Sequence, residues 1–260
     1  MRWLFPFLTR RANSEPAPCQ GLIPEGQRVY AIGDVHGRFD LLVALIDRIR
    51  IDNRCRGEAD THIVMLGDLI DRGPDSAHVI EYLRAQQGGF ATFHFLCGNH
   101  EEVMLATLAT GSWPEDTNWL RFGGYETMMS YGATATLFRE RGEALAREMR
   151  ALVPETHIAF LESFADRIVI GDYLFVHAGI RPGIPIDRQS AYDMRWIRSP
   201  FLEDERDHGV IVVHGHSVTG EPEMRANRIG IDTGAYRTGT LSALGLEGAD
   251  RWLIAETKAP

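Results

Sequence analysis

The sequence predicts an α+β fold with two β-sheets at its centre and helices on their outer sides. Its first half alternates strand-like and helix-like runs, which is typical of a parallel sheet with crossover helices. Its second half is rich in short strand-like runs between glycine turns, which favours antiparallel pairing. Helical patterns dominate about residues 104–165 between the halves. We interpret residues 26–260 as one domain that carries this segment as a helical insertion.

The elements of the first half follow from hydrophobic periodicity. The apolar run 29–33 predicts a strand, and the segment 39–50 repeats leucine and isoleucine at helical spacing. Further strands are expected at 62–67 and 92–98. A helix is expected at 75–87, after Pro74 and before Gly88-Gly89. Another helix is expected to open at Glu101.

The insertion and the second half give a second series of elements. Helices are expected at 119–131, 136–150 and 154–163. Strands are expected at 167–170, 173–177, 210–214, 228–231, 240–246 and 251–256.

Residues 1–25 are interpreted as a flexible leader, because the segment 13–18 is rich in proline, serine and alanine. An apolar stretch near the start is interrupted by Pro6 and is too short for a signal peptide or a membrane span, so no stable membrane insertion is expected. Cys19, Cys55 and Cys97 are widely spaced, which suggests reduced thiols and a cytoplasmic location. The net charge of −9 argues against binding to a nucleic-acid duplex.

Short polar clusters beside strand-like runs hold most of the possible metal ligands. They are Gly33-Asp34-Val35-His36-Gly37-Arg38, Gly67-Asp68-Leu69-Ile70-Asp71-Arg72-Gly73, Gly98-Asn99-His100-Glu101, His177-Ala178-Gly179, His214-Gly215-His216 and Asp232-Thr233-Gly234. A single cluster of this kind is usually a turn. Their repetition at several strand ends predicts a polynuclear metal site at one edge of the sheets.

The donor types indicate the metals. Carboxylates, imidazoles and an amide suit manganese, iron, zinc or magnesium, and the absence of thiolates argues against a structural zinc site. Asp34 and His36 alternate in sequence, which places them on one face of an extended strand end. Asp68 follows the next strand, where it could bridge two ions. Two-metal sites of this kind hydrolyse phosphate esters.

Three segments carry a resemblance to a known family. GDVHGR, GDLIDRGPDS and GNHE match the GDxHG, GDxxDRG and GNHE signatures of the metal-dependent phosphoprotein phosphatases, and VHAG and HGH complete the pattern. The chain therefore resembles this group of calcineurin-like metallophosphoesterases, in particular its bacterial serine/threonine phosphatases. The resemblance spans Gly33 to about Gly234. It implies a four-layer α/β/β/α fold with two central mixed sheets.

The resemblance also implies a ligand set. Two divalent ions would be bound, with manganese favoured and iron, zinc, nickel or magnesium as alternatives. Asp68 would bridge the two ions. The full set of implied ligands is Asp34, His36, Asp68, Asn99, His177 and His214.

Catalytic and substrate-binding roles follow from the same resemblance. His100 would be the general acid, oriented by Asp71, and Arg72 would hold the phosphate. The segment Trp196-Ile197-Arg198 is similar to a Trp-x-Arg segment of the bacterial enzymes, which favours Arg198 over Arg195 as a second phosphate ligand. Tyr236 is a further candidate for substrate contact.

The expected reaction is hydrolysis of phosphoserine and phosphothreonine monoesters by direct attack of a metal-bridging hydroxide. The alternative is a symmetrical bis(5'-nucleosyl)-tetraphosphatase or a related small-molecule phosphoesterase. The substrate would thus be a phosphoprotein or a small phosphoester, and no segment suggests a regulatory subunit. Residues 119–127 are consistent either with a simple helix start or with a lid that selects the substrate.

Overall fold

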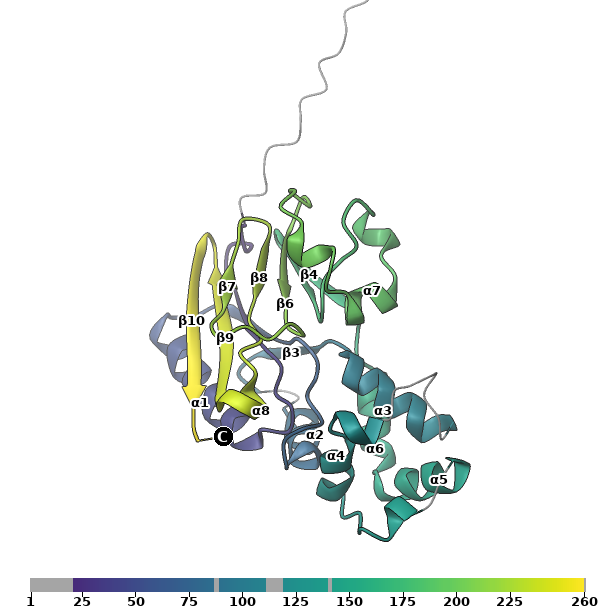
Figure 1. Cartoon of the computed structure of the whole chain (residues 1–260). Helices are drawn as coiled ribbons and strands as arrows, with labels where there is room; N and C mark the ends of the chain where they lie inside the picture. Colours follow the sequence, from purple (N-terminus) through teal and green to yellow (C-terminus); the bar gives the residue numbers. More distant parts are fainter. Residues whose placement is uncertain (1–20, 87–88, 111–118, 140–141, 260) are drawn as a thin grey trace, which may run out of the picture.

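The computed structural model describes residues 21–86, 89–110, 119–139 and 142–259 (Figure 1). The predicted leader lies almost entirely outside these ranges, as do residues 111–118 of the insertion and positions 87, 140 and 141 of two expected helices. Within the described ranges, no helix has the length and apolar character needed to cross a membrane.

The first sheet is mixed and has the strand order β10-β9-β1-β2-β3. Strands β1 (Gln27–Ile32), β2 (Asp60–Met65) and β3 (Thr92–Phe95) are parallel. Helices α1 (Phe39–Cys55) and α2 (Ser76–Arg84) connect them, as predicted. Strands β9 (Thr240–Glu247) and β10 (Asp250–Thr257) form an antiparallel hairpin. Strand β9 also pairs with β1 in antiparallel orientation.

The second sheet has the order β4-β5-β6-β8-β7. Its strands are β4 (Arg167–Ile170), β5 (Tyr173–Val176), β6 (Ile211–His214), β7 (Glu223–Met224) and β8 (Arg228–Gly230). The β4–β5 and β7–β8 pairs are antiparallel, but β5–β6 and β6–β8 are parallel. The prediction of antiparallel pairing is therefore confirmed for the β4–β5 pair and wrong for the β5–β6 and β6–β8 pairs. The cause is the long β5–β6 connection, which contains α7 (Ala191–Trp196) and allows a parallel crossover.

Three apolar clusters define four layers. One fills the space between the sheets, with Ala31 and Val64 from the first sheet facing Phe175 and Val213 from the second. A second joins the outer face of the first sheet to α1 and α2. A third joins the outer face of the second sheet to α7 and the short helix η4 (Phe201–Glu203). The predicted α+β fold with two mixed central sheets flanked by helices is confirmed.

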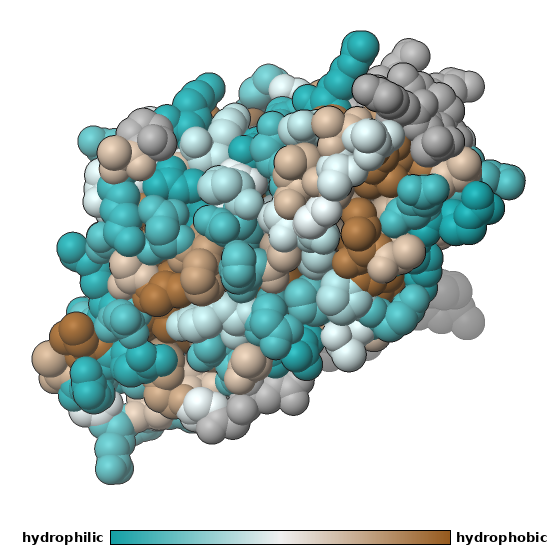
Figure 2. Space-filling model, turned by 90° about the horizontal axis from the view of Figure 1, so that it is seen from below, coloured by the Kyte–Doolittle hydropathy of each residue, from teal (hydrophilic) through white to brown (hydrophobic). Residues whose placement is uncertain are grey.

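The insertion packs on the same core as α1 and α2. It contains the second half of α3 (Asn99–Thr110) and all of η1 (Trp119–Phe122), α4 (Gly124–Ser130), η2 (Leu137–Arg139), α5 (Gly142–Leu152) and α6 (Glu155–Glu162). The helix predicted at 119–131 is divided, because Gly123 adopts a φ of 113°. In Figure 1 these helices gather at the lower end of the molecule, and Figure 2 views that end, where hydrophobic patches lie among hydrophilic side chains.

Two short elements complete the chain: η3 (Ile186–Arg188) and α8 (Ala235–Thr238). Helix α8 follows the last polar cluster and carries Tyr236. Parallel strands of both sheets end toward the same region. They are β1, β2 and β3 of the first sheet, and β5 and β6 of the second. The loops after them bring the polar clusters together.

Candidate metal centre and active site

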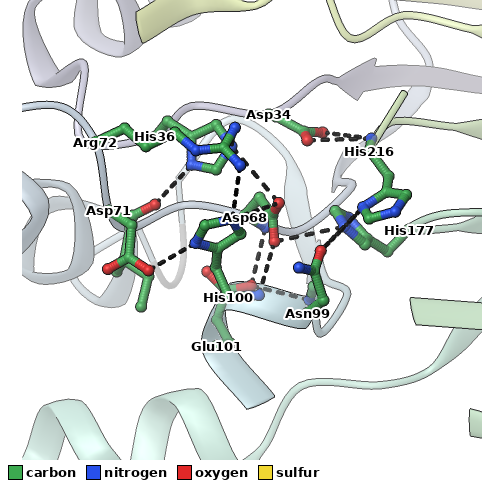
Figure 3. A network of polar contacts seen from close by, with 12 residues as sticks. Asp34, His36, Asp68, Asp71, Arg72, Asn99, His100, Glu101, His177 and His216 are labelled. Atoms are coloured by element: carbon green, nitrogen blue, oxygen red, sulfur yellow. Dashed lines mark hydrogen bonds and ion pairs between the residues drawn. The ribbon is translucent and has the colours of Figure 1, made fainter. Parts of the chain in front are cut away.

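Asp68 lies at the centre of the polar clusters, between two groups of side chains (Figure 3). Its Oδ2 lies 3.6 Å from His36 Nε2 and 3.8 Å from His100 Nε2. Its Oδ1 lies 3.4 Å from His177 Nε2. This carboxylate is almost completely buried and faces histidines on both sides. Its position is suited to bridging two cations.

The second group consists of Asn99, His177 and His216. Asn99 Oδ1 lies 3.0 Å from His177 Nε2 and 2.9 Å from His216 Nδ1. Nδ1 of His177 lies 2.8 Å from the carbonyl oxygen of Leu66, an acceptor, so this nitrogen carries the proton. The Nε2 lone pair of His177 is therefore free to bind a metal.

The structure does not bring His214, the ligand that the resemblance implied, into this group, and His216 lies there instead. His214 ends β6 on the same face as Val212, toward the outer layer, where its ring lies 5.2 Å from the ring of Phe201. His216 comes after the strand and turns back with a φ of 61°. Strand alternation separates the two histidines, and only His216 reaches Asn99.

Asp34 lies beside two further carboxylates. It accepts a hydrogen bond from the backbone N–H of His216 at 3.1 Å. Burial raises its pKa well above the usual value, and the charges of Asp232 and Asp68 raise it further. Asp232 is also buried, and its Oδ2 has no hydrogen-bond partner in the described part of the chain. Such a concentration of buried negative charge is stabilised by cations.

The histidines of the cluster are held in the form that binds metals. Burial lowers the pKa of His36, His177 and His216 below the ordinary value. They are therefore unprotonated at neutral pH, as metal ligation requires. Oxygen and unprotonated nitrogen donors without a thiolate fit divalent ions of the manganese, iron, zinc or magnesium type.

Three donors surround the carboxylate of Asp71, which is fully buried. His100 Nδ1 lies 2.6 Å from its Oδ2, and Trp119 Nε1 donates to the same oxygen at 2.8 Å. Thr127 Oγ1 donates to Oδ1 at 2.6 Å. Burial alone would lower the pKa of His100, but the charges of Asp68 and Asp71 and the hydrogen bond to Asp71 raise it. This arrangement orients His100 with its Nδ1–H toward Asp71 and raises its pKa.

Arg72 connects His100 to the cluster. Its Nη1 donates to His36 Nε2 and its Nη2 donates to His100 Nε2, both at 2.9 Å. Its guanidinium carbon lies 4.6 Å from the centre of the Tyr236 ring. The same ring makes an edge contact with His36, with centroids 5.3 Å apart. Arg72 and Tyr236, both singled out in the sequence, thus lie together beside His36.

The two candidate arginines of α7 and its flank have different surroundings. Arg195 is engaged by Asp166 at 2.6 Å and Glu102 at 3.1 Å, which is a structural ion-pair network. Arg198 lines the same cavity as Arg72 and His100. The geometry therefore favours Arg198, as the sequence did.

Glu101 belongs to the GNHE motif, and the resemblance assigns it no role. It is fully buried, and its carboxylate accepts hydrogen bonds from the backbone N–H groups of Asp68, Leu69 and Gly98 at 2.7–2.9 Å. Burial and the charge of Asp68 raise its pKa to about 7, while the backbone hydrogen bonds oppose this shift. Glu101 ties the loops after β2 and β3 to each other.

Backbone strain is concentrated at the same place. In the described ranges, every non-glycine residue with a positive φ belongs to the site: His36, Asp68, Asp71, Arg72 and His216. Left-handed conformations cost such residues of order 1–3 kcal/mol each and cluster at functional sites.

Comparison with known proteins agrees with this geometry. A family model described as calcineurin-like phosphoesterase matches residues 27–237, and the chain belongs to this family. It is 26% identical over 251 residues to a zinc-dependent endopolyphosphatase of Saccharomyces cerevisiae, covering 82% of this chain and 74% of that protein. Members of the family use divalent metals, and the clusters around Asp68 can bind them.

Two further relatives match more locally. Serine/threonine-protein phosphatase 1 of Salmonella typhimurium is 34% identical over 98 residues, covering 38% of this chain and 39% of that protein. A symmetrical bis(5'-nucleosyl)-tetraphosphatase of Hamiltonella defensa is 42% identical over 77 residues, covering 30% and 25%. The chain thus spans less than half the length of these two relatives. The relatives define a phosphoester hydrolase and leave its substrate open.

Solved structures show the same fold. One, of a protein assigned provisionally as a diadenosine tetraphosphatase, has a TM-score of 0.62 at 21% identity and covers 92% of this chain and 98% of its own. A mutant of a cold-active protein tyrosine phosphatase also has a TM-score of 0.62, at 20% identity, and covers 92% and 83%.

Proposed function

We propose that this metallophosphoesterase is a phosphoprotein phosphatase of the bacterial serine/threonine type, which hydrolyses phosphoserine and phosphothreonine monoesters. The observation that carries the proposal is the His100–Asp71 pair, which lies beside the Asp68 cluster and next to Arg72. An alkyl leaving group needs a proton, and a buried, oriented imidazole is suited to supply it.

The proposed metal ligands are Asp34, His36, Asp68, Asn99, His177 and His216, with manganese as the favoured ion. Two divalent ions, when bound, lower the pKa of water from about 15.7 toward about 7 and offset phosphoryl charge. Arg72 and Arg198 would bind phosphoryl oxygens through paired N–H groups. When Arg72 binds phosphoryl oxygens instead of His100 Nε2, this nitrogen would be free to carry a proton and release it to the leaving oxygen, while Asp71 keeps the Nδ1–H in place.

The alternative is a symmetrical dinucleoside tetraphosphatase, which the relatives also suggest. A polyphosphatase activity has similar support from another relative. Both substrates are long polyanions. Arg72 and Arg198 are the cationic side chains of the cavity beside His100, and no lysine or further arginine of the described residues lines it. The monoester is therefore the better match to the charge of this cavity.

The test is a substrate panel with the full chain and Mn²⁺. It compares a phosphoserine peptide, diadenosine tetraphosphate and inorganic polyphosphate by kcat/KM, with His100→Asn as the control for site-dependent turnover. We expect the phosphopeptide to give the highest value. Hydrolysis of the dinucleotide or the polymer without hydrolysis of the peptide would refute the proposal.

A further inference from the structure

Asp232 belongs to the last polar cluster of the sequence, and neither the family motifs nor the proposed ligand set gives it a role. It lies in the loop that leads from β8 to α8. Its side chain is only 1% exposed. A buried carboxylate is costly unless it is paired, so its surroundings should show what stabilises it.

The two oxygens of this carboxylate differ. Oδ1 accepts a hydrogen bond from the backbone N–H of Gly234 at 2.9 Å, which closes a turn. Oδ2 is buried and receives no hydrogen bond from any residue of the described ranges. The loop is also held by Thr233, whose Oγ1 donates to the carbonyl oxygen of Thr240 at 2.8 Å. The fold therefore uses one oxygen of Asp232 and leaves the other unpaired.

The carboxylate of Asp232 lies close to that of Asp34. Gly33 precedes Asp34 and packs against the residues that follow β8. A Cβ atom at Gly33 would lie 2.5 Å from the Ile231 carbonyl oxygen and 3.6 Å from the Asp232 Cα atom. After burial, the charge of Asp232 is the largest cause of the raised pKa of Asp34, ahead of the charge of Asp68. Three carboxylates are thus gathered in the interior.

The protein does not supply a donor for the unpaired oxygen. The backbone N–H of His216 donates to Asp34, at 3.2 and 3.1 Å from its two oxygens (Figure 3). The guanidinium of Arg72 donates to His36 and His100, and Asp232 Oδ2 stays unpaired. Oδ2 therefore needs a partner from outside the chain.

A divalent ion fits this need, because carboxylate oxygens are ligands that such ions accept. We propose that Asp232 is a further ligand of the metal centre, whose Oδ2 binds the ion on the Asp34 side. This inference rests on the metal centre of the proposed function and on no particular substrate.

The experiment compares Asp232→Asn with the wild type, using calorimetry for Mn²⁺ affinity and melting temperatures with and without Mn²⁺. Asparagine keeps an oxygen that can accept from Gly234 and replaces Oδ2 by an amide that can donate to Asp34. The metal-free variant should therefore melt no lower than the metal-free wild type. Mn²⁺ affinity should fall by at least about 10-fold, and the rise in melting temperature that Mn²⁺ causes should shrink.

Asp193→Asn is the matched control. Asp193 is also a buried carboxylate, at 8% exposure, but Arg181 and Ser190 donate to its oxygens. Its replacement should lower the melting temperature by similar amounts with and without Mn²⁺, and should leave Mn²⁺ affinity unchanged. If Asp232→Asn does not fold by circular dichroism, Asp232→Ser takes its place, because a serine hydroxyl can also accept from the Gly234 N–H.

The outcomes separate the two proposals. If the Asp232 variant binds Mn²⁺ as tightly as the wild type, or melts lower by the same amount in both forms as the control does, only the present inference fails. If the wild type binds Mn²⁺ but does not hydrolyse a phosphoserine peptide, only the proposed function fails. If the wild type binds neither Mn²⁺ nor Zn²⁺, both fail.

Discussion

Replacing Trp119 with phenylalanine should impair the proposed general acid, His100, without changing His100 or Asp71. The change deletes the indole N–H that donates to Asp71 Oδ2 at 2.8 Å and retains an aromatic ring in a position that is 2% exposed. The same oxygen holds His100 Nδ1 at 2.6 Å. Asp71 would keep His100 and Thr127 as partners, so the carboxylate would lose one of its three side-chain donors.

The size of the effect follows from the charge of the acceptor. A hydrogen bond to a charged group contributes about 1.5–3 kcal/mol, and about 1.36 kcal/mol corresponds to a tenfold change in rate. If Asp71 then orients His100 less well, kcat on an alkyl phosphate should fall by roughly 10- to 100-fold. p-Nitrophenyl phosphate needs little protonation of its leaving group, so its turnover should fall by less than about threefold.

The assay measures kcat and KM for both substrates in the wild type, Trp119→Phe and a control variant. Trp252→Phe is the control, because Trp252 also donates its Nε1–H to a carboxylate, Asp52, at 3.1 Å, but outside the site. It should lose stability without losing activity on either substrate. Equal losses of kcat on the two substrates in Trp119→Phe would show that Trp119 supports the fold alone.

Three further predictions concern the ligands and the phosphate site. Asp68→Ala should abolish metal-dependent turnover and reduce the metal content measured by mass spectrometry; full metal content with retained turnover would contradict the bridging role. His216→Gln should weaken metal binding by about 10-fold or more, measured by calorimetry, whereas His214→Gln should not; the reverse result would make His214 the ligand, as the resemblance implied. Arg198→Ala should lower kcat/KM by roughly 10²–10³-fold, whereas Arg195→Ala should mainly lower the melting temperature.

The strands and crossover helices of the first half were predictable because their patterns are local. Each pattern lies within a short stretch of the sequence: the apolar runs at β1 and β2, and the helical periodicity of α1. The pairing of the second half was not predictable in this way. Whether β6 lies parallel to β5 depends on the path of the long connection between them, which hydrophobic alternation does not encode.

The candidate site was predicted as a set of motifs, but its internal geometry was not. The choice between His214 and His216 depends on which face of β6 points toward the first sheet, and both faces of that strand are apolar. The role of Glu101 was also hidden, because its partners are backbone N–H groups of a different loop. Sequence motifs identify such residues but do not reveal what each side chain contacts.

The insertion illustrates how contacts between distant segments decide between interpretations that the sequence leaves open. Its segment 119–127 was consistent with a plain helix start or with a substrate-selecting lid. In the structure, Trp119 and Thr127 both donate to Asp71, so the segment holds the carboxylate that contacts the proposed acid, His100. The same Trp119 ring lines the cavity beside His100. A substitution in this segment that moves the cavity wall should therefore also disturb the acid, and substrate selection and proton transfer should change together.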